Sequence, residues 1–233
     1  MDSNSRPFPL DDWRIRMPLA RTRTDVRQSW TASKVNAFVS RFFRQTDLLI
    51  WRAGRSDSPP SMPVGTGFHR VTARSRPAER DRVEIAMRAA GEPKGLAAER
   101  FGHGDECCGW MVNGALVSFG WITRADRNIG PAELLDAPER LFLFNFHTTK
   151  QARGRGYYPA LLLMLRYEFG REGFSEFIID VNSRNAASIS GIEKAGFRMV
   201  ARVGFQVLLN CLYLLRSATS IDPAHRLLDL HGG

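Results

Sequence analysis

Cysteine is scarce in this sequence, which excludes two kinds of protein. Of the three cysteines among the 233 residues, Cys107 and Cys108 are adjacent and Cys211 is far from both. This arrangement is neither a disulfide framework nor a set of ligands at metal-binding spacing. We therefore expect buried, unpaired thiols in a reducing compartment, and we predict no metal site.

Long apolar runs are also absent. The first thirty residues are charged and contain Pro7, Pro9 and Pro18, so they do not resemble the apolar region of a signal peptide. The longest apolar stretch, residues 203–215, is far shorter than the roughly 20 residues that a membrane-spanning helix needs. We therefore expect a soluble, cytoplasmic protein that does not act at a membrane.

Lysine is rare, although the chain is strongly basic. The net charge is +9, with 33 lysines and arginines against 24 aspartates and glutamates. Such a charge attracts nucleic acids and polyanionic small ligands alike. The cations are nearly all arginines spread along the chain, and no zinc finger, RNP-type motif or convincing helix-turn-helix accompanies them. The sequence therefore argues against nucleic-acid binding, and a polyanionic small ligand explains the charge equally well.

Proline, serine and glycine divide the chain into four predicted parts. The first is a basic arm (1–27) that is either ordered or disordered, and the second is an extension (28–66). The extension contains a helix, a short strand at 47–51 and a Ser/Pro-rich linker. The main domain (67–216) and a tail (217–233) follow. The main domain begins where strand-like and helix-like patterns start to alternate.

The main domain is predicted to be a mixed α/β sheet structure. Strands are expected at 68–73, 139–149 and 176–181, and two more within 197–215. Helices are expected at 77–90, at 95–101, from the glycine-rich turn after 149 to about residue 169, and at 184–196. Residues 106–123 are expected to form a hairpin, because Asn113 and Gly114 accept the positive φ angles of a two-residue turn.

The segment that links the strand at 139–149 to the following helix is unusual. It reads Arg153-Gly154-Arg155-Gly156, so glycines remove the Cβ atoms that would crowd an approach to the backbone. The N–H groups of such a turn and of the helix start can converge on a pyrophosphate, with the positive end of the helix dipole behind them. A tight turn that needs glycine only for its geometry is the alternative interpretation.

Residues 141–202 resemble the GCN5-related N-acetyltransferase (GNAT) superfamily, and a weaker match extends upstream to Gly67. That family carries Arg/Gln-x-x-Gly-x-Gly/Ala after a long central strand, then Asn, a small residue three positions on, and Glu-Lys-x-Gly-Phe. These motifs are matched here by residues 153–158, by Asn185 and Ser188, and by residues 193–197. A second register of the first motif starts at Gln151. The resemblance implies a mixed, mostly antiparallel central sheet flanked by helices, to which this chain adds an N-terminal helix and strand.

The resemblance also implies how acetyl-CoA is bound. Backbone groups near Phe146 and Thr148 would pair with the pantetheine arm like an added strand, amides from Gly154 to Tyr158 would hold the pyrophosphate, and the Asn185 side chain would meet the cofactor near the pantetheine. The predicted cofactor-binding residues are Phe146, Thr148, Arg153, Gly154, Arg155, Gly156, Tyr158 and Asn185. Transfer in this family is direct, from the thioester to a bound amine, mainly by proximity and backbone stabilisation of the oxyanion.

Several positions depart from the family pattern. Tyr158 stands at the second Gly/Ala position, Ile192 replaces a tyrosine thought to protonate the leaving thiolate, and phenylalanines occupy 142 and 144, where relatives keep a base. The catalytic candidates are therefore the donors Ser188, Tyr157 and Tyr158 and the bases His147 and Glu106. By strict alternation His147 faces away from Phe144, although a bulge would re-aim it.

The sequence leaves the acceptor open. Five aromatic residues either line an apolar pocket or form core: Trp110, Trp121, Phe142, Phe144 and Phe146. No acidic cluster marks a cationic acceptor, and amino sugars, amino acids and protein N-termini all remain open. We predict an acetyl-CoA-dependent N-acetyltransferase that acts on a primary amine of a small molecule, of amino-sugar or amino-acid type. The alternative is a catalytically degenerate GNAT-fold protein that binds CoA or a protein partner. The N-terminal extension either caps the acceptor side or forms a homodimer contact.

Overall fold

The computed structural model describes residues 43–61, 65–124, 138–208 and 212–221. The predicted basic arm, the helix before residue 43 and most of the tail lie outside these residues. The chain divides into two compact units. The larger one contains Asp47–Val203 and the residues from Ala218 onward, and the candidate site described below lies in it.

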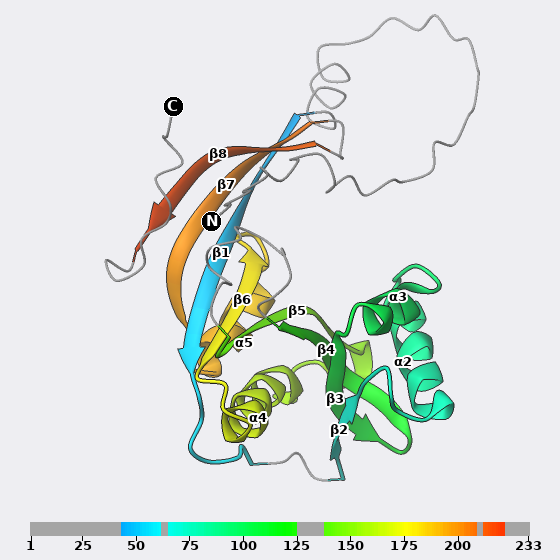
Figure 1. Ribbon diagram of the computed structural model, residues 1–233. Helices are drawn as coiled ribbons and strands as arrows, with labels where there is room; N and C mark the ends of the chain where they lie inside the picture. The colour runs from blue at the N-terminus through cyan, green and yellow to red at the C-terminus, as the bar shows by residue number, and fades with distance from the viewer. Residues whose placement is uncertain (1–42, 62–64, 125–137, 209–211, 222–233) are drawn as a thin grey trace, which may run out of the picture. The chain divides into compact units, whose positions relative to one another are not determined.

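The described residues form one mixed sheet with helices on both faces (Figure 1). Its strands are β1 (Phe43–Gly54), β2 (Gly67–Val71), β3 (Glu106–Val112), β4 (Ala115–Arg124), β5 (Arg140–Thr148), β6 (Glu176–Asn182), β7 (Arg198–Leu208) and β8 (Leu212–Ser220). The helices are α2 (Pro77–Ala89), α3 (Leu96–Gly102), α4 (Tyr157–Arg171) and α5 (Ala186–Lys194), with a short 3₁₀ turn, η2 (Lys150–Ala152).

The strand order is β2-β3-β4-β5-β6-β1-β7-β8. The pairs β2–β3, β3–β4, β4–β5 and β6–β1 are antiparallel, whereas β5 and β6 are parallel. The predicted fold class, a mixed and mostly antiparallel sheet flanked by helices, is therefore confirmed. None of the helices among the described residues is long and apolar enough to cross a membrane.

The predicted hairpin is present. Strands β3 and β4 pair with Val112 opposite Ala115, so the turn between them consists of Asn113 and Gly114 alone. Their φ angles are 48° and 80°, the left-handed values that a two-residue turn of this kind requires.

Strand β1 corrects the predicted domain organisation. The sequence pattern placed a short strand at 47–51 in an extension outside the main domain. In the structure Leu48–Gly54 pairs with Glu176–Asn182, so this part of β1 is a member of the central sheet beside β6. The physical reason is burial: Ile50 and Trp51 are consecutive and both buried, which requires cover on both faces of the strand.

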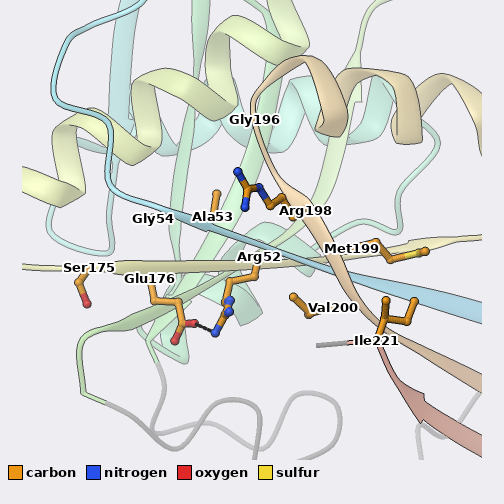
Figure 2. Close-up of a pocket in the computed structure, with 10 residues that line it drawn as sticks. All are labelled: Arg52, Ala53, Gly54, Ser175, Glu176, Gly196, Arg198, Met199, Val200 and Ile221. Atoms are coloured by element: carbon orange, nitrogen blue, oxygen red, sulfur yellow. Dashed lines mark hydrogen bonds and ion pairs between the residues drawn. The ribbon is translucent and has the colours of Figure 1, made fainter. Parts of the chain in front are cut away.

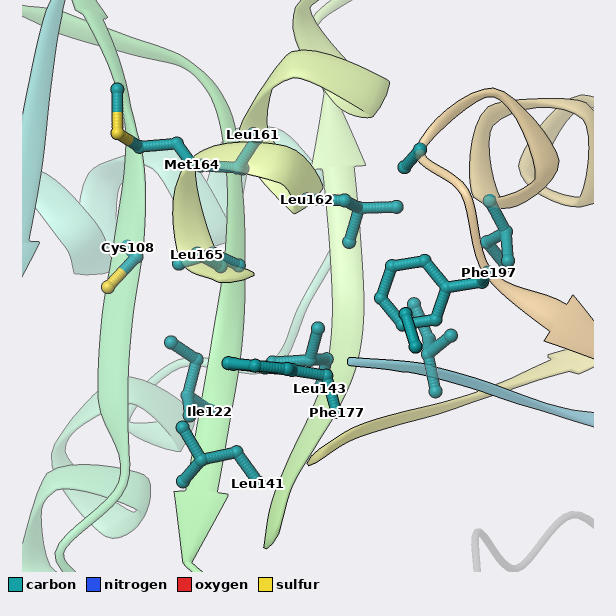
Figure 3. Close-up of a cluster of buried hydrophobic side chains, with 14 of the residues drawn as sticks. Cys108, Ile122, Leu141, Leu143, Leu161, Leu162, Met164, Leu165, Phe177 and Phe197 are labelled. Atoms are coloured by element: carbon teal, nitrogen blue, oxygen red, sulfur yellow. The ribbon is translucent and has the colours of Figure 1, made fainter. Parts of the chain in front are cut away.

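Two apolar clusters hold the helices on opposite faces of the sheet. One contains residues of α4 packed on β5 and β6, among them Leu161, Leu165, Leu143 and Phe177 (Figure 3). The other joins α2 and α3 to β3 and β4, for example through Val83, Met87, Phe101 and Trp121. Trp110 and Trp121 are fully buried, so these two aromatic residues form core and do not line a ligand pocket.

Candidate active site

A cleft begins where β5 and β6 separate. Only Arg140–Leu143 of β5 and Glu176–Ile179 of β6 pair with each other. Strand β5 nevertheless continues to Thr148, and β6 continues to Asn182. The last residues of β5 keep β4 as a neighbour on the other side. Their edge toward β6 is therefore free to pair with an extended ligand. The cleft has a volume of about 1250 Å³.

The glycine-rich turn forms one end of this cleft. Gly154 and Gly156 have φ angles of 74° and 77°, so both need the left-handed conformation that glycine adopts without strain. A Cβ atom built on either glycine would meet nothing within 4 Å, which shows that the turn faces open space. Helix α4 follows at once, and its first helical hydrogen bond runs from the Ala160 N–H to the Gly156 carbonyl. The N–H groups before Pro159 are therefore left over for an anion.

Cations line the cleft that contains the turn. Arg153 lines the cleft and donates from Nε to the Thr148 carbonyl at 3.2 Å. Lys150 and Lys194 also line it, and the described lining residues include no aspartate or glutamate. Arg155 is exposed and does not line the cleft, so its predicted place beside the pyrophosphate is not supported by the structure. It lies between Gly154 and Gly156, which both have left-handed φ angles.

The start of α5 forms the facing wall. The Asn185 Oδ1 atom accepts a hydrogen bond of 3.1 Å from the Ser188 N–H and so caps the helix. Both residues line the cleft. The cap uses the side-chain oxygen of Asn185, and its amide NH₂ group is the part left to meet a ligand.

Tyr158 is accommodated by a glycine on α5. A Cβ atom at Gly191 would lie 2.4 Å from Cδ1 of Tyr158, so the ring occupies the space that any other residue would fill. The ring also packs against Phe146, with the two centroids 5.5 Å apart. Burial, and secondarily the Asp180 carboxylate, raise the pKa of Tyr158, so it is a neutral phenol at physiological pH. Gly191 therefore explains how the loop tolerates a bulky residue at position 158.

A β-bulge places His147 in the cleft. Phe119 of β4 pairs with His147 of β5, and Trp121 of β4 pairs with Phe144 of β5. The two β4 residues lie two positions apart in the sequence, whereas the two β5 residues lie three apart. Asn145 takes up the extra residue, with a φ angle of 50°. His147 therefore lies on the same face of the sheet as Phe144, and the prediction from strict alternation is wrong. His147 lines the cleft and contacts the Phe119 ring at a centroid distance of 5.4 Å.

The other catalytic candidates separate into two groups. Ser188 and Tyr157 line the cleft, although Tyr157 is largely buried and its carbonyl accepts a hydrogen bond of 3.0 Å from Trp110 Nε1. Glu106 does not line the cleft, which contradicts its proposed role as a base. Its carboxylate forms ion pairs with Arg70 and with Arg124, the latter at 3.3 Å, and these pairs hold it in a structural network.

The structure adds residues that the sequence did not reveal. Glu92 follows α2, and its Oε1 lies 3.0 Å from Nε2 of His147. The sequence around it, Gly-Glu-Pro, indicates only a turn, and no pattern connects it to a histidine 55 residues later. Glu92 itself does not line the cleft, whereas Arg82 and Ile85 of α2 do. Ile85 is 67% exposed, an unusual state for a large apolar side chain on a helix that packs against a sheet.

A second, smaller pocket of about 820 Å³ lies at the opposite end of β6. There Arg52 donates to Glu176 at 3.0 Å, and Arg198 points away from that pair (Figure 2). None of the predicted site residues lines it. Arg52, the more buried of the two arginines that line this pocket, is already neutralised by Glu176. We therefore assign the candidate active site to the larger cleft.

Comparison with known proteins identifies the fold. No family model matches the chain, and no curated protein sequence matches it. An acetyltransferase of the GNAT family from Colwellia psychrerythraea has a similar structure, with a TM-score of 0.53 and 16% identity over 76% of this chain and 63% of that chain. A Drosophila protein is similar with a TM-score of 0.50 and 14% identity, over 76% of this chain and 57% of that one.

A functionally unknown conserved protein from Staphylococcus epidermidis also matches, with a TM-score of 0.50 and 10% identity over 79% of this chain and 69% of that chain. The matches span less than two thirds of the Colwellia and Drosophila chains. The chain therefore has a GNAT-type fold, as its two motifs predicted, and the low identities establish the fold alone.

Proposed function

We propose that this protein is an acetyl-CoA-dependent N-acetyltransferase that transfers the acetyl group directly to a primary amine of a small molecule. One observation carries the proposal. The turn at Gly154 and Gly156 opens, at the start of α4, into the cleft that begins where β5 and β6 separate. An anion site and a free strand edge thus lie in one cavity, as a ligand with a pyrophosphate and an extended amide-bearing arm requires.

The residues present fit CoA. The cavity of about 1250 Å³ exceeds the roughly 300–1,000 Å³ of ordinary small-molecule sites, which leaves room for a second substrate. Lys150, Arg153 and Lys194 provide positive charge for the phosphates. The edge of β5 toward β6 near Phe146 and Thr148 provides backbone groups for the pantetheine amides, and the Thr148 carbonyl there also accepts a hydrogen bond from Arg153 Nε.

The reaction needs little covalent chemistry from the protein. The amine nitrogen attacks the thioester carbonyl, the C–S bond breaks, and the thiolate leaves with a proton. Holding the two substrates together supplies much of the rate enhancement. Ser188 and Tyr157 lie on the cleft wall and are the proposed donors to the thiolate, while Ile192 is fully buried and has no proton to give.

The lining of the cleft favours an acceptor of amino-acid type over a polyamine. It contains no carboxylate among the described residues, so nothing there would attract a polycation. On the α2 side, Ile85 and Ala89 offer an apolar surface, and Arg82 lies one helical turn before Ile85. An acceptor with an apolar side chain and a carboxylate would contact both kinds of group.

Calorimetric titration with acetyl-CoA, CoA and dephospho-CoA tests the proposal first. We expect micromolar binding of acetyl-CoA, and weaker binding of dephospho-CoA because the missing 3′-phosphate removes partners for the cleft cations. Thiol release is then measured with phenylalanine, glucosamine and spermidine as acceptors. Binding without thiol release from a broad amine panel would favour the degenerate, CoA-binding alternative. No binding at millimolar ligand would refute the proposal.

A further inference from the structure

We propose that Glu92 positions His147 as the base that accepts the proton of the attacking amine, an inference that rests on the proposed function. Glu92 holds the N–H of Nε2 and thereby leaves Nδ1 as the basic nitrogen. Glu92 is a positioning residue in this scheme, and His147 is the catalytic one.

The hydrogen bonds around Nε2 determine where the imidazole proton lies. Nε2 of His147 is 3.0 Å from Oε1 of Glu92 and 2.9 Å from Oδ1 of Asn145. A carboxylate and an amide carbonyl oxygen only accept, so Nε2 must carry the hydrogen. The neutral ring then has its lone pair on Nδ1, for which the described part of the chain provides no hydrogen-bond partner.

The orientation of the Asn145 amide is independently determined. Its Oδ1 accepts a hydrogen bond of 3.1 Å from Nη1 of Arg100, and its Nδ2 donates to Oε1 of Glu92 at 2.8 Å. A guanidinium group cannot accept a hydrogen bond and a carboxylate cannot donate one. Reversing the amide would therefore break both interactions, so the oxygen faces His147.

The network is held by elements that are far apart in the sequence. Asn145 is the bulge residue of β5, Arg100 comes from α3, and Glu92 follows α2. The Arg100 guanidinium lies over the rings of Trp121 and Phe144, 5.0 and 5.1 Å from their centroids. His147 lines the cleft, and the side chains of His147 and Glu92 are only 25% and 19% exposed, so the pair is largely shielded from bulk water.

The proton balance is simple. The neutral amine attacks the thioester carbonyl and forms an N–C bond, and the nitrogen becomes positively charged. Nδ1 of His147 takes one proton from it, and the Glu92 carboxylate stabilises the imidazolium. The tetrahedral adduct then collapses, and the C–S bond breaks with its electron pair going to sulfur. The proposed donor, Ser188 or Tyr157, gives its proton to the thiolate, and the proton held by His147 then restores that donor. The products are the amide and CoA thiol.

The arrangement is tested first without any substrate. In ¹⁵N-histidine NMR spectra, the signal that disappears in His147→Gln is assigned to His147 among the five histidines. We expect the neutral ring to carry its proton on Nε2 in the wild type and to become a mixture of both tautomers in Glu92→Ala. A wild-type ring protonated on Nδ1 would overturn the inference.

Kinetics with the best amine from the thiol-release panel test its catalytic role. We expect His147→Gln to lower kcat by about 10²-fold or more, and Glu92→Gln by about 10- to 100-fold, as for other positioning residues. The KM for acetyl-CoA and its calorimetric affinity should change less than twofold. Glu99→Gln is the matched control, because it removes the same charge from an exposed position on α3 outside the cleft, and it should behave as wild type.

Two failures are distinguishable. If the wild type turns over an amine and His147→Gln keeps its rate, the inference is wrong and the proposed function stands. If the wild type neither binds acetyl-CoA nor releases thiol with any amine, the proposed function and the inference both fall.

Discussion

Replacing Gly156 by glutamate is the sharpest test of where the CoA pyrophosphate binds. Gly156 is the residue before α4 and has a φ angle of 77°, and a Cβ atom built there meets nothing within 4 Å. A glutamate at this position would therefore project into open space that belongs to the cleft. It would place a carboxylate where the proposed ligand has its phosphates.

The expected effect combines a backbone cost and a charge repulsion. A non-glycine residue in the left-handed region costs about 1–2 kcal/mol, which lowers stability but does not by itself oppose CoA. Two like charges about 4 Å apart repel by about 4 kcal/mol at the effective dielectric constant of a protein surface. Allowing for side-chain movement, we expect a loss of about 2–4 kcal/mol in binding, or roughly 30- to 1,000-fold in Kd.

Calorimetric titration of acetyl-CoA measures this loss, and two control variants separate its causes. Gly156→Ala pays the backbone cost without the charge and should keep its affinity within about threefold. Gly104→Glu has the same charge at another left-handed glycine with open space, φ 84°, away from the cleft, and should bind normally. Unchanged affinity in Gly156→Glu, with the protein folded, would place the pyrophosphate elsewhere and refute the reasoning.

Three further predictions concern packing and buried groups. Gly191→Ala should destabilise the protein by about 1–3 kcal/mol in urea denaturation, because its Cβ would lie 2.4 Å from Cδ1 of Tyr158. Asp180→Asn should raise the Tm at pH 7. Burial raises the pKa of Asp180, so charging it in the folded state costs stability as pH rises above its unfolded value of about 3.9. Cys107 and Cys108 should resist iodoacetamide in the native protein, because both are buried and burial raises the pKa of each thiol.

Each of these predictions has a clear contrary result. Gly191→Ala should lower the free energy of unfolding less in a Tyr158→Ala protein than in the wild type. An equal loss of stability in the two proteins would exclude the Tyr158 ring as the cause. For Asp180→Asn, the gain in Tm should diminish as the pH falls toward 4, whereas a gain that persists there would have another origin. For the cysteines, mass spectrometry on a Cys211→Ser variant should show alkylation only in urea, and rapid native labelling would contradict the burial.

The sequence determined the features that depend on local backbone preference. Asn113 and Gly114 form the predicted turn because few other residue pairs accept positive φ at both positions. Gly154 and Gly156 likewise adopt the left-handed values that a tight turn into a helix requires. Asn185 caps α5 because an asparagine before a helix accepts a hydrogen bond from the N–H three residues on. The spacing of these local features is what made the fold predictable.

Only the tertiary structure decided which distant residues meet. Strand β1 had the pattern of a strand, but no local signal indicates that β6 is its neighbour. The bulge at Asn145 turned His147 toward the cleft, and the turn after α2 brought Glu92 to its Nε2, while Glu106 was held by Arg70. Strand partners and bulges follow from the pairing and packing of whole elements. The direction in which a side chain points at the end of β5 is therefore settled only once the sheet is assembled.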